Sequence, residues 1–480
     1  MDYINTISEI ASALETFIKA SNKGRVNVIN QEPLHKVIKI LNLKKITSKG
    51  ELQGATLEKF VNDYLNLHTR LHHPGYLGHQ CAPPHYAASF AALINAFTNN
   101  VPSVYEMGPA SASVEHFMIN WMLEHVGWKT IPDKKPNTSQ NLVHGGGVFV
   151  NGGSIANLTA LVIARSKVVP AIWEVGHSSD LALLLPSECH YSLTKAAGVI
   201  GFGKSSIFFV DVDQTGAIIP DRLINTLSKV KSEGKQPIAL VANACSTSVG
   251  IYDPLDEIAD FCSENRLWMH VDGAHGASVL LSEKYRHLLK GVIRADSLTW
   301  DAHKLLQTPS LCAALLVKKH EDLVKGIHVG DNASYLFHEK DQLGYDSLQW
   351  TLETTKSGLG EKLFFVLGTI GEQGLVEYID SRYQLAFKAY TYLQKLPDFD
   401  CPVAPQSNIL CFKHEGDDQL QIEIRKQLLK NKDFYLTSTL FNETRYLRLV
   451  FMSKATTLSD IERLVMSIRE IVQKRRKLPD

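Results

Sequence analysis

The stretch SLTWDAHKLLQTPSLCAALLV, Ser297–Val317, contains two short apolar runs on either side of a polar turn that holds Asp301, His303 and Lys304. Short apolar runs without charges are typical of strands that are buried on both faces of a sheet. Most lysines are solvated surface groups. A lysine at the exit of a buried strand, beside a histidine, therefore needs an explanation from the rest of the chain.

Similar runs recur from about residue 140 onward and alternate with helical stretches: GVFV, LALLL, SIFFV, IALVANA and LWMHVD. This alternation predicts an α/β fold with a largely parallel sheet. Residues 1–80 are mostly helical in pattern. After about residue 370, long helices are followed by the strand-like runs SNILCFKH, DFYLTSTLF and RYLRLVFMS. We therefore expect an N-terminal helical segment over 1–80, a large domain over 81–370 and a small α+β domain over 371–480.

Composition limits the possible functions. Fifty basic residues balance fifty acidic ones in 480 residues, so no overall field favours nucleic acid or an anionic membrane surface. No apolar run reaches the roughly 18 residues of a membrane span, and the acidic N-terminal stretch has no signal-peptide pattern. The seven cysteines are scattered and form no metal-ligand cluster with histidine. We expect a cytoplasmic protein without a bound metal, nucleic-acid partner or membrane partner.

One glycine-rich turn is a candidate phosphate site. In VFVNGGSIANLTALVIAR, an apolar run leads through Gly152, Gly153 and Ser154 into a helical pattern. Exposed amides at the N-terminus of a helix attract phosphate. The turn matches neither common nucleotide-binding fingerprint. By itself, such a turn is more often an ordinary helix start.

Two further side chains lie near the ends of predicted strands. His190 follows LLPSEC, and Asp272 ends LWMHVD, 32 residues before Lys304. Taken singly, His190 is explained as a helix cap and Asp272 as a turn residue. Together with the glycine turn, these residues supply a phosphate cradle, a flat ring, a carboxylate and an amine. That combination suits pyridoxal 5′-phosphate, whose aldehyde bonds to a lysine and whose protonated pyridine ring accepts electrons.

Five motifs in the same order resemble those of the group II pyridoxal-phosphate amino-acid decarboxylases: NGGSIAN, CHYSLTKAAGVIGFG, MHVDGAHGA, DSLTWDAHK and ASYLF. This family includes the glutamate, cysteine sulfinate, diaminobutyrate and aromatic amino-acid enzymes. The resemblance extends from about residue 70 to 460. It implies the type I fold of pyridoxal-phosphate enzymes, with a mainly parallel seven-stranded sheet in a large domain and a small C-terminal α+β domain.

The resemblance also implies a role for each matched residue. Lys304 would hold the cofactor as a Schiff base, Asp272 would pair with the pyridine nitrogen, and His190 would stack on the ring. Tyr335 would protonate the substrate carbon, and Arg448 would meet the substrate carboxylate. The other implied cofactor contacts are Ala274 on the opposite ring face, Gly153, Ser154 and His303 at the phosphate, and Ser246 near the phenolic oxygen.

The activity implied is α-decarboxylation of an L-amino acid in a homodimer, with the active site at the subunit interface. Because ASYLF is most similar to the branch that acts on acidic substrates, we expect glutamate, aspartate or cysteine sulfinate. 2,4-Diaminobutyrate and aromatic amino acids are alternatives. A transaminase, another lyase of the same fold and a catalytically silent binding paralogue are further alternatives.

Two positions depart from the family pattern. Gly78 and His79 stand where the glutamate enzymes have Asn-Gln, and His79, Gln80 and Trp350 are candidates for the side-chain pocket. Asp301 replaces an asparagine that is common before the lysine motif. Because a carboxylate repels a phosphate, we expect Asp301 to face elsewhere or to accept a backbone amide.

Overall fold

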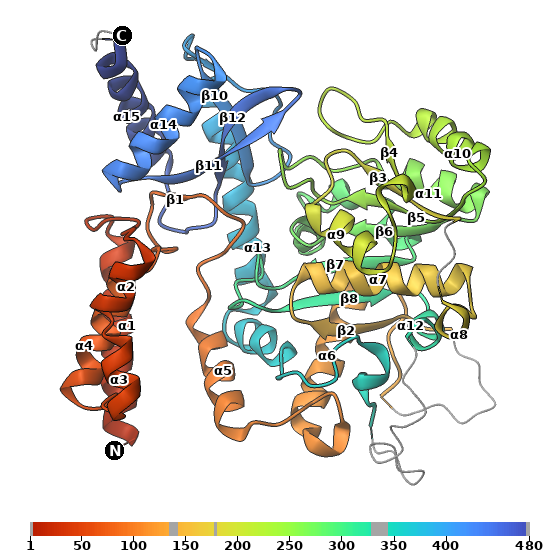
Figure 1. Cartoon of the computed structure of the whole chain (residues 1–480), viewed down its shortest axis with the longest axis horizontal. Helices are drawn as coiled ribbons and strands as arrows, with labels where there is room; N and C mark the ends of the chain where they lie inside the picture. Colours follow the sequence, from red (N-terminus) through yellow and green to blue (C-terminus); the bar gives the residue numbers. More distant parts are fainter. Residues whose placement is uncertain (1–2, 134–142, 177–179, 328–343, 477–480) are drawn as a thin grey trace. The chain divides into compact units, whose positions relative to one another are not determined.

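The computed structural model describes residues 3–133, 143–176, 180–327 and 344–476, which form two compact units (Figure 1). The larger unit is Pro84–Ser381, and the smaller combines Met1–Pro83 with Arg382–Asp480. The two ends of the chain therefore belong to one unit. The three-part division at residues 80 and 370 stays a prediction.

The larger unit is built on a seven-stranded sheet of order β2-β8-β7-β6-β5-β3-β4. All strands run parallel except β8, which is antiparallel to both β7 and β2. This mainly parallel sheet confirms the predicted α/β class. The strands are β2 (Gly146–Val150), β3 (Leu181–Pro186), β4 (Ile207–Val210), β5 (Gln236–Asn243), β6 (Trp268–Asp272), β7 (Ser297–Asp301) and β8 (Ala313–Val317).

Strand register brings the site residues to one edge of this sheet. Asp272 is the last residue of β6 and pairs with Thr299 of β7, and Asp301 ends β7. Every side chain of β6 and β7 is buried, so these apolar runs form the core. Parallel strands carry their functional groups at their carboxyl ends. This is the edge where Asp272 and Lys304 lie.

Helices flank the sheet of the larger unit (Figure 1). The helix α7 follows β2 through Gly152, whose φ of +103° favours glycine. Its buried Ala156, Ala160 and Ala164 have 0% exposure and recur every fourth residue, so they form one packed face. The helices are α5 (Tyr86–Thr98), α6 (Pro109–Val126), α7 (Gly153–Val168), α8 (Ile172–Val175), α9 (Tyr191–Val199), α10 (Leu223–Ser232), α11 (Leu255–Asn265), α12 (His320–Gly326) and α13 (Gly360–Leu393), which continues into the smaller unit.

The smaller unit contains a mixed five-stranded sheet of order β1-β11-β12-β10-β9. Its β1 pairs in parallel with β11, and Tyr76 lies opposite Tyr435. A segment near residue 76 thus completes the C-terminal α+β layer. The strands are β1 (Tyr76–Leu77), β9 (Phe399–Asp400), β10 (Ile409–His414), β11 (Tyr435–Phe441) and β12 (Thr444–Val450), and the helices are α1 (Tyr3–Asn22), α2 (Leu34–Ile40), α3 (Leu43–Lys49), α4 (Ala55–Asn66), α14 (Asp418–Asn431) and α15 (Leu458–Arg476).

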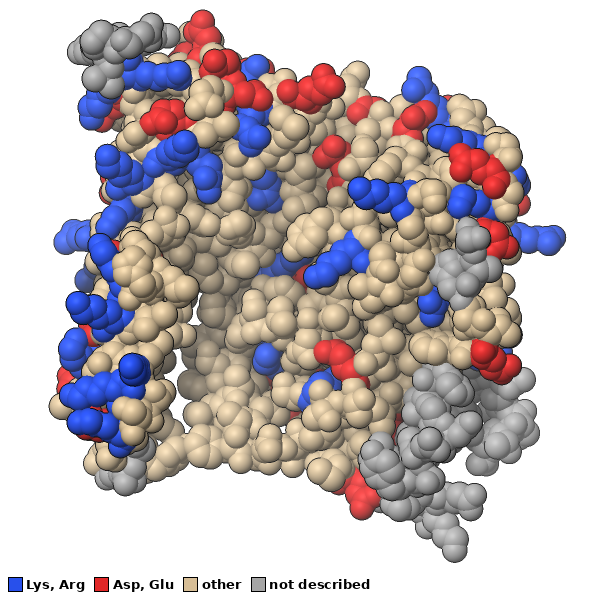
Figure 2. Space-filling view, in the orientation of Figure 1, with Lys and Arg blue, Asp and Glu red and all other residues tan. Residues whose placement is uncertain are grey.

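One face of the molecule carries both basic and acidic side chains. Basic and acidic side chains are interspersed with uncharged ones on the face shown in Figure 2. Among the described residues, no helix combines the length and apolarity needed to cross a membrane.

Candidate active site

A pocket of about 220 Å³ opens at the carboxyl ends of the central strands of the larger unit. The N-termini of α7 and α9 face it, and the residues after β5, β6 and β7 complete it. The pocket brings together seven of the predicted site residues. Its lining comprises Asn151, Gly152, Gly153, Ser154, Asn157, His190, Ser192, Asn243, Cys245, Thr247, Asp272, Ala274, His275, Asp301, His303, Lys304 and Leu311.

The glycine turn is fixed to a segment that is distant in the sequence. The backbone N–H and Nδ2 of Asn151 donate to the carboxylate of Glu353, at 3.2 and 2.6 Å. The residue that precedes the glycine turn is therefore fixed to a segment 202 positions away. The amides of the turn, at the start of α7, are suited to an anion.

Asp272 is held as a fixed carboxylate in the pocket. Its side chain is 7% exposed; Oδ2 accepts a 2.9 Å hydrogen bond from Nδ2 of Asn157, and Oδ1 accepts one of 3.2 Å from the backbone N–H of Ala274. A buried carboxylate is costly unless it is hydrogen-bonded. The two bonds leave Asp272 oriented toward the pocket and available to a cationic partner.

Asn157 connects Asp272 to a buried polar network beneath the pocket. Its Oδ1 accepts hydrogen bonds from Oγ1 of Thr299 at 2.7 Å and from Nε2 of His270 at 3.1 Å. His270 is completely buried, and burial lowers its pKa to about 4. The ring is thus neutral, and since it donates through Nε2, its Nδ1 accepts from Ser297 at 2.8 Å.

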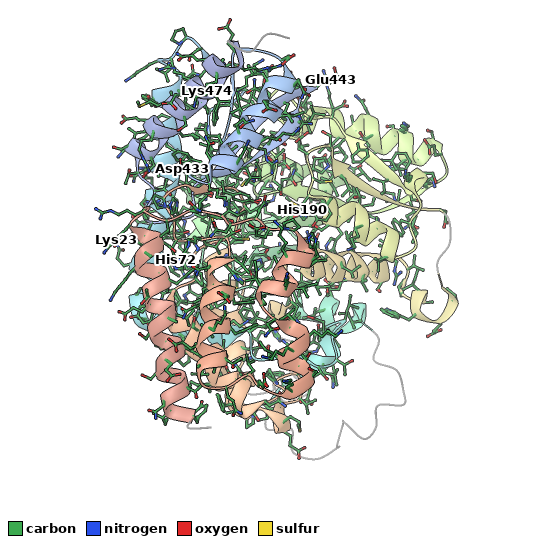
Figure 3. All side chains as sticks on the ribbon, turned by 60° about the vertical axis from the view of Figure 1, so that its left-hand side comes forward. Lys23, His72, His190, Asp433, Glu443 and Lys474 are labelled. Carbon is green, nitrogen blue, oxygen red and sulfur yellow. The ribbon has the colours of Figure 1, made fainter. Side chains whose placement is uncertain are left out.

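His190 precedes α9 and lines the pocket, and its side chain is labelled in Figure 3. Its Nδ1 caps the helix by accepting from the backbone N–H of Ser192 and lies 2.8 Å from Oγ of that residue. Burial lowers the pKa of His190, and the nearby Asp272 partly opposes this effect. His190 therefore caps the helix and lines the pocket at the same time, so the two interpretations of this residue do not exclude each other. Ala274 also lines the pocket.

Lys304 and His303 converge on Asp301. Oδ2 of Asp301 lies 3.4 Å from Nζ of Lys304 and 3.5 Å from Nε2 of His303. Nδ1 of His303 lies 2.9 Å from the carbonyl oxygen of Cys312. The expectation that Asp301 faces elsewhere was wrong, because its carboxylate lines the same pocket and has two cationic or ionisable neighbours.

The structure does not bring every predicted residue to this pocket. Oγ of Ser246 accepts from the backbone N–H of Ile251 at 3.1 Å, although the flanking Cys245 and Thr247 line the pocket. Trp350 packs in the core of the larger unit, edge-on to His320. Tyr335 lies outside the described residues.

The predicted substrate-binding residues form a cluster within the smaller unit. Arg448 is 6% exposed, and its guanidinium donates to the carbonyl oxygen of Gly78 and to Oε1 of Gln80, both at 3.3 Å. Nε2 of His79 lies 2.8 Å from the hydroxyl of Tyr435. Burial lowers the pKa of His79, and the arginines nearby lower it further.

Sequence reasoning missed the polar residues that support the site. Asn157 lies one helical turn after Gly153 on α7, and residues four apart share a helix face. That spacing could have placed it at the pocket. The contact of Asn151 with Glu353 joins residues 202 positions apart, and no local pattern indicates it.

The pocket has the features of a pyridoxal-phosphate site on an α/β sheet. It combines a helix N-terminus that suits an anion, a fixed carboxylate, a histidine that caps a helix, and a lysine at the end of a strand. The profile of the pyridoxal-dependent decarboxylase conserved domain matches residues 72–415. The chain belongs to this family and is a pyridoxal-phosphate-dependent amino-acid decarboxylase.

Relatives with names and solved structures agree with this assignment. Acidic amino acid decarboxylase GADL1 of Mus musculus is 32% identical over 402 residues, which are 83% of this chain and 70% of that protein. Cysteine sulfinic acid decarboxylase of Rattus norvegicus is 33% identical over 77% of this chain and 72% of that protein. The crystal structure of mouse CSAD in apo form superposes with a TM-score of 0.83 at 25% identity and covers 97% of this chain and 98% of that chain.

The residues present fit the cofactor. Turn amides and Ser154 would hold the phosphate, Asp272 would face the pyridine nitrogen, and His190 with Ala274 would flank the ring. When bound, pyridoxal 5′-phosphate supplies an electron sink for the charge left on the substrate carbon. The described residues contain no cluster of side chains that could hold a metal ion.

Proposed function

We propose that the protein decarboxylates an acidic L-amino acid, such as cysteine sulfinate, aspartate or glutamate, to the corresponding amine. One observation carries this proposal. Two groups of relatives at 32–33% identity, over more than three quarters of the chain, are named for acidic substrates.

The cluster around Arg448 supports an anionic substrate. Arg448 is buried and held by Gly78 and Gln80, and the positive charges of Arg448 and Arg425 both act on His79. Because Arg448 is assigned to the carboxylate that every amino acid carries, the positive charge of Arg425 near His79 is the part of this environment that favours an anionic side chain over the ammonium group of diaminobutyrate. We propose that Arg448 meets the carboxylate of the substrate and that His79 contributes to side-chain selection.

In the larger unit, the presence of Lys304, Asp272 and His190 in one pocket supports the proposed roles. Lys304 bonds covalently to the cofactor, Asp272 maintains the positive charge on the pyridine nitrogen, and His190 holds the ring plane. Because Asp272 is fixed by Asn157, its charge needs no rearrangement when the substrate reacts. Tyr335, which the resemblance assigns to protonation of the substrate carbon, completes the proposal.

A substrate panel tests the proposed specificity. Carbon dioxide release is measured with cysteine sulfinate, aspartate and glutamate, and with asparagine and glutamine as uncharged controls of the same shape. Diaminobutyrate and tryptophan are included. We expect release only from the acidic members. Preference for diaminobutyrate or tryptophan would contradict the acidic specificity but leave the decarboxylase assignment intact.

Borohydride reduction tests the position of the covalent bond. After reduction, peptide mass mapping is expected to place the pyridoxyl group on Lys304. Lys356 is the comparison lysine because it is more deeply buried than Lys304, at 4% exposure, and is paired with Glu115. A pyridoxyl group on Lys356 or another lysine would refute the assignment of Lys304.

We also propose that the protein acts as a cytoplasmic homodimer. The helix α5 has no charged residue and exposes Tyr86, Phe90, Ile94 and Phe97 at 50–61%. These positions follow a helical repeat, so they form one apolar stripe. The surface over α5 is uncharged in Figure 2. Large exposed apolar patches are typical of protein interfaces, and a second copy of this chain is the occupant we propose.

Light scattering after size exclusion tests this interface. Phe90→Glu is expected to convert the dimer to monomer, because a carboxylate at the interface would be buried without a partner. Phe209→Glu is the control, since Phe209 has a similar exposure of 54% and lies on β4. An active wild-type monomer would contradict the proposal.

A further inference from the structure

Asp301 is the carboxylate in the pocket that the cofactor chemistry does not use. Its side chain is 2% exposed. Oδ2 lies within 3.5 Å of both Lys304 and His303, whereas Oδ1 is buried and accepts no hydrogen bond from the described residues. An unsatisfied buried carboxylate oxygen is costly. Its position in the pocket therefore suggests a specific role.

Gly153 makes room for this carboxylate. A Cβ atom at residue 153 would lie 2.8 Å from both Oδ1 and Oδ2 of Asp301, closer than side-chain carbons approach. The φ of Gly153 is not among the positive values. Glycine is therefore required here by the close approach of Asp301 and not by the backbone angle.

The same contact places a negative charge directly against the glycine turn. The amides of Gly153 and Ser154, at the start of α7, are the proposed phosphate donors. The other charged or ionisable side chains lining the pocket are those of Asp272, His190, Cys245, His275, His303 and Lys304. A phosphate that approaches the turn therefore meets a carboxylate that already engages Lys304 and His303.

We propose that Asp301 is a positioning residue that holds the side chains of Lys304 and His303 in the cofactor-free protein, at the expense of phosphate affinity. The proposal rests on the proposed function, because it assigns the turn to a phosphate. The side chains of Lys304 and His303 are 19% and 11% exposed, and each loses its carboxylate neighbour when the charge of Asp301 is removed. Removal of the carboxylate charge therefore destabilises the cofactor-free protein, yet it removes a repulsion from the phosphate position.

The experiment uses the full chain after removal of the cofactor, with inorganic phosphate as the probe. Thermal unfolding is followed over a phosphate titration at constant ionic strength. Asp301→Asn is expected to lower the melting temperature without phosphate and to bind phosphate about tenfold more tightly, which corresponds to about 1.4 kcal/mol. A purely structural Asp301 would give lower stability together with unchanged or weaker phosphate binding, and that result would overturn the proposal.

Two further variants separate charge from other effects. Asp301→Ala removes the charge without adding an amide, so tighter phosphate binding in Asp301→Asn alone would also overturn the proposal. Asp322→Asn is the matched control. Asp322 is similarly buried, at 5% exposure, and is paired with Lys167, but it does not line the pocket. It is expected to lose stability with no change in phosphate affinity.

A double-mutant cycle tests the contact with Gly153. Gly153→Ala is expected to destabilise the wild type, and to cost much less in Asp301→Ala, because the carboxylate oxygens are gone. Equal costs in both backgrounds would refute the close packing of the carboxylate. The phosphate titration requires no covalent bond to Lys304. Failure of borohydride mapping with a normal phosphate response would therefore count against the proposed function and not against the role of Asp301.

Discussion

Asn157→Ala tests whether the network under the pocket orients the catalytic carboxylate. Asn157 is 1% exposed. Its amide donates to Asp272 and Ser192, at 2.9 and 3.1 Å, and accepts from Thr299 and His270, at 2.7 and 3.1 Å. The substitution removes all of these bonds. Among the described residues, Asp272 then keeps the hydrogen bond from the backbone N–H of Ala274.

The magnitude follows from which groups lose a partner. A hydrogen bond to a charged group contributes about 2 kcal/mol, so the loss of the bond to Asp272 is expected to lower kcat about 30-fold if orientation matters. The hydroxyl of Thr299 and the N–H of His270 also lose their acceptor in the interior. Unsatisfied buried donors cost about 1–3 kcal/mol each, so we expect the free energy of unfolding to fall by about 3 kcal/mol.

Two measurements distinguish orientation from folding. Urea unfolding of the cofactor-free protein gives the stability change, and carbon dioxide release gives kcat of the folded, loaded enzyme. Asn265→Ala is the control, because the side chain of Asn265 donates to the carbonyl oxygen of Phe261 on the same helix, α11, away from the pocket. If Asn157→Ala loses stability as expected but keeps kcat within about threefold, Asn157 supports the fold and does not orient Asp272.

Three further outcomes follow from the contacts described above. Asp272→Asn is expected to retain its circular dichroism spectrum but lose about 100-fold in kcat, about 2.7 kcal/mol, because an amide cannot hold the pyridine nitrogen charged; near wild-type turnover would contradict this role. Because burial lowers the pKa of His270 to about 4, against about 6.5 when unfolded, stability present above pH 6.5 is lost as the pH falls toward 4. Between pH 7 and pH 5, the free energy of unfolding from urea titrations should therefore fall by about 2 kcal/mol less in His270→Gln than in the wild type. An identical fall in both proteins would show that His270 is not the titrating group. Lys356→Met leaves the carboxylate of Glu115 buried without its 2.8 Å partner, so we expect the free energy of unfolding to fall by about 3–5 kcal/mol. The double variant Lys356→Met/Glu115→Gln should recover part of this loss. No recovery would indicate that packing of the lysine side chain dominates.

The sequence by itself determined the class of fold and the main reactive groups. Apolar runs that alternate with helical patterns predicted a parallel sheet, because burial on both faces requires uncharged strands. Asp272 and Lys304 were expected near strand ends, and the pocket contains both. These conclusions depend on local patterns and chain order. These conclusions do not require knowledge of which strands are neighbours in the sheet.

Only the tertiary structure decided which side chains meet. Asn157 contacts Asp272 across 115 residues, and Asp301 turns into the pocket although charge repulsion predicted the opposite. The physical reason is that strand register and helix placement bring Lys304, His303 and Gly153 around Asp301. Hydrophobic periodicity records which face of an element is buried. It carries no information about the polar partner that a buried side chain will find on another element.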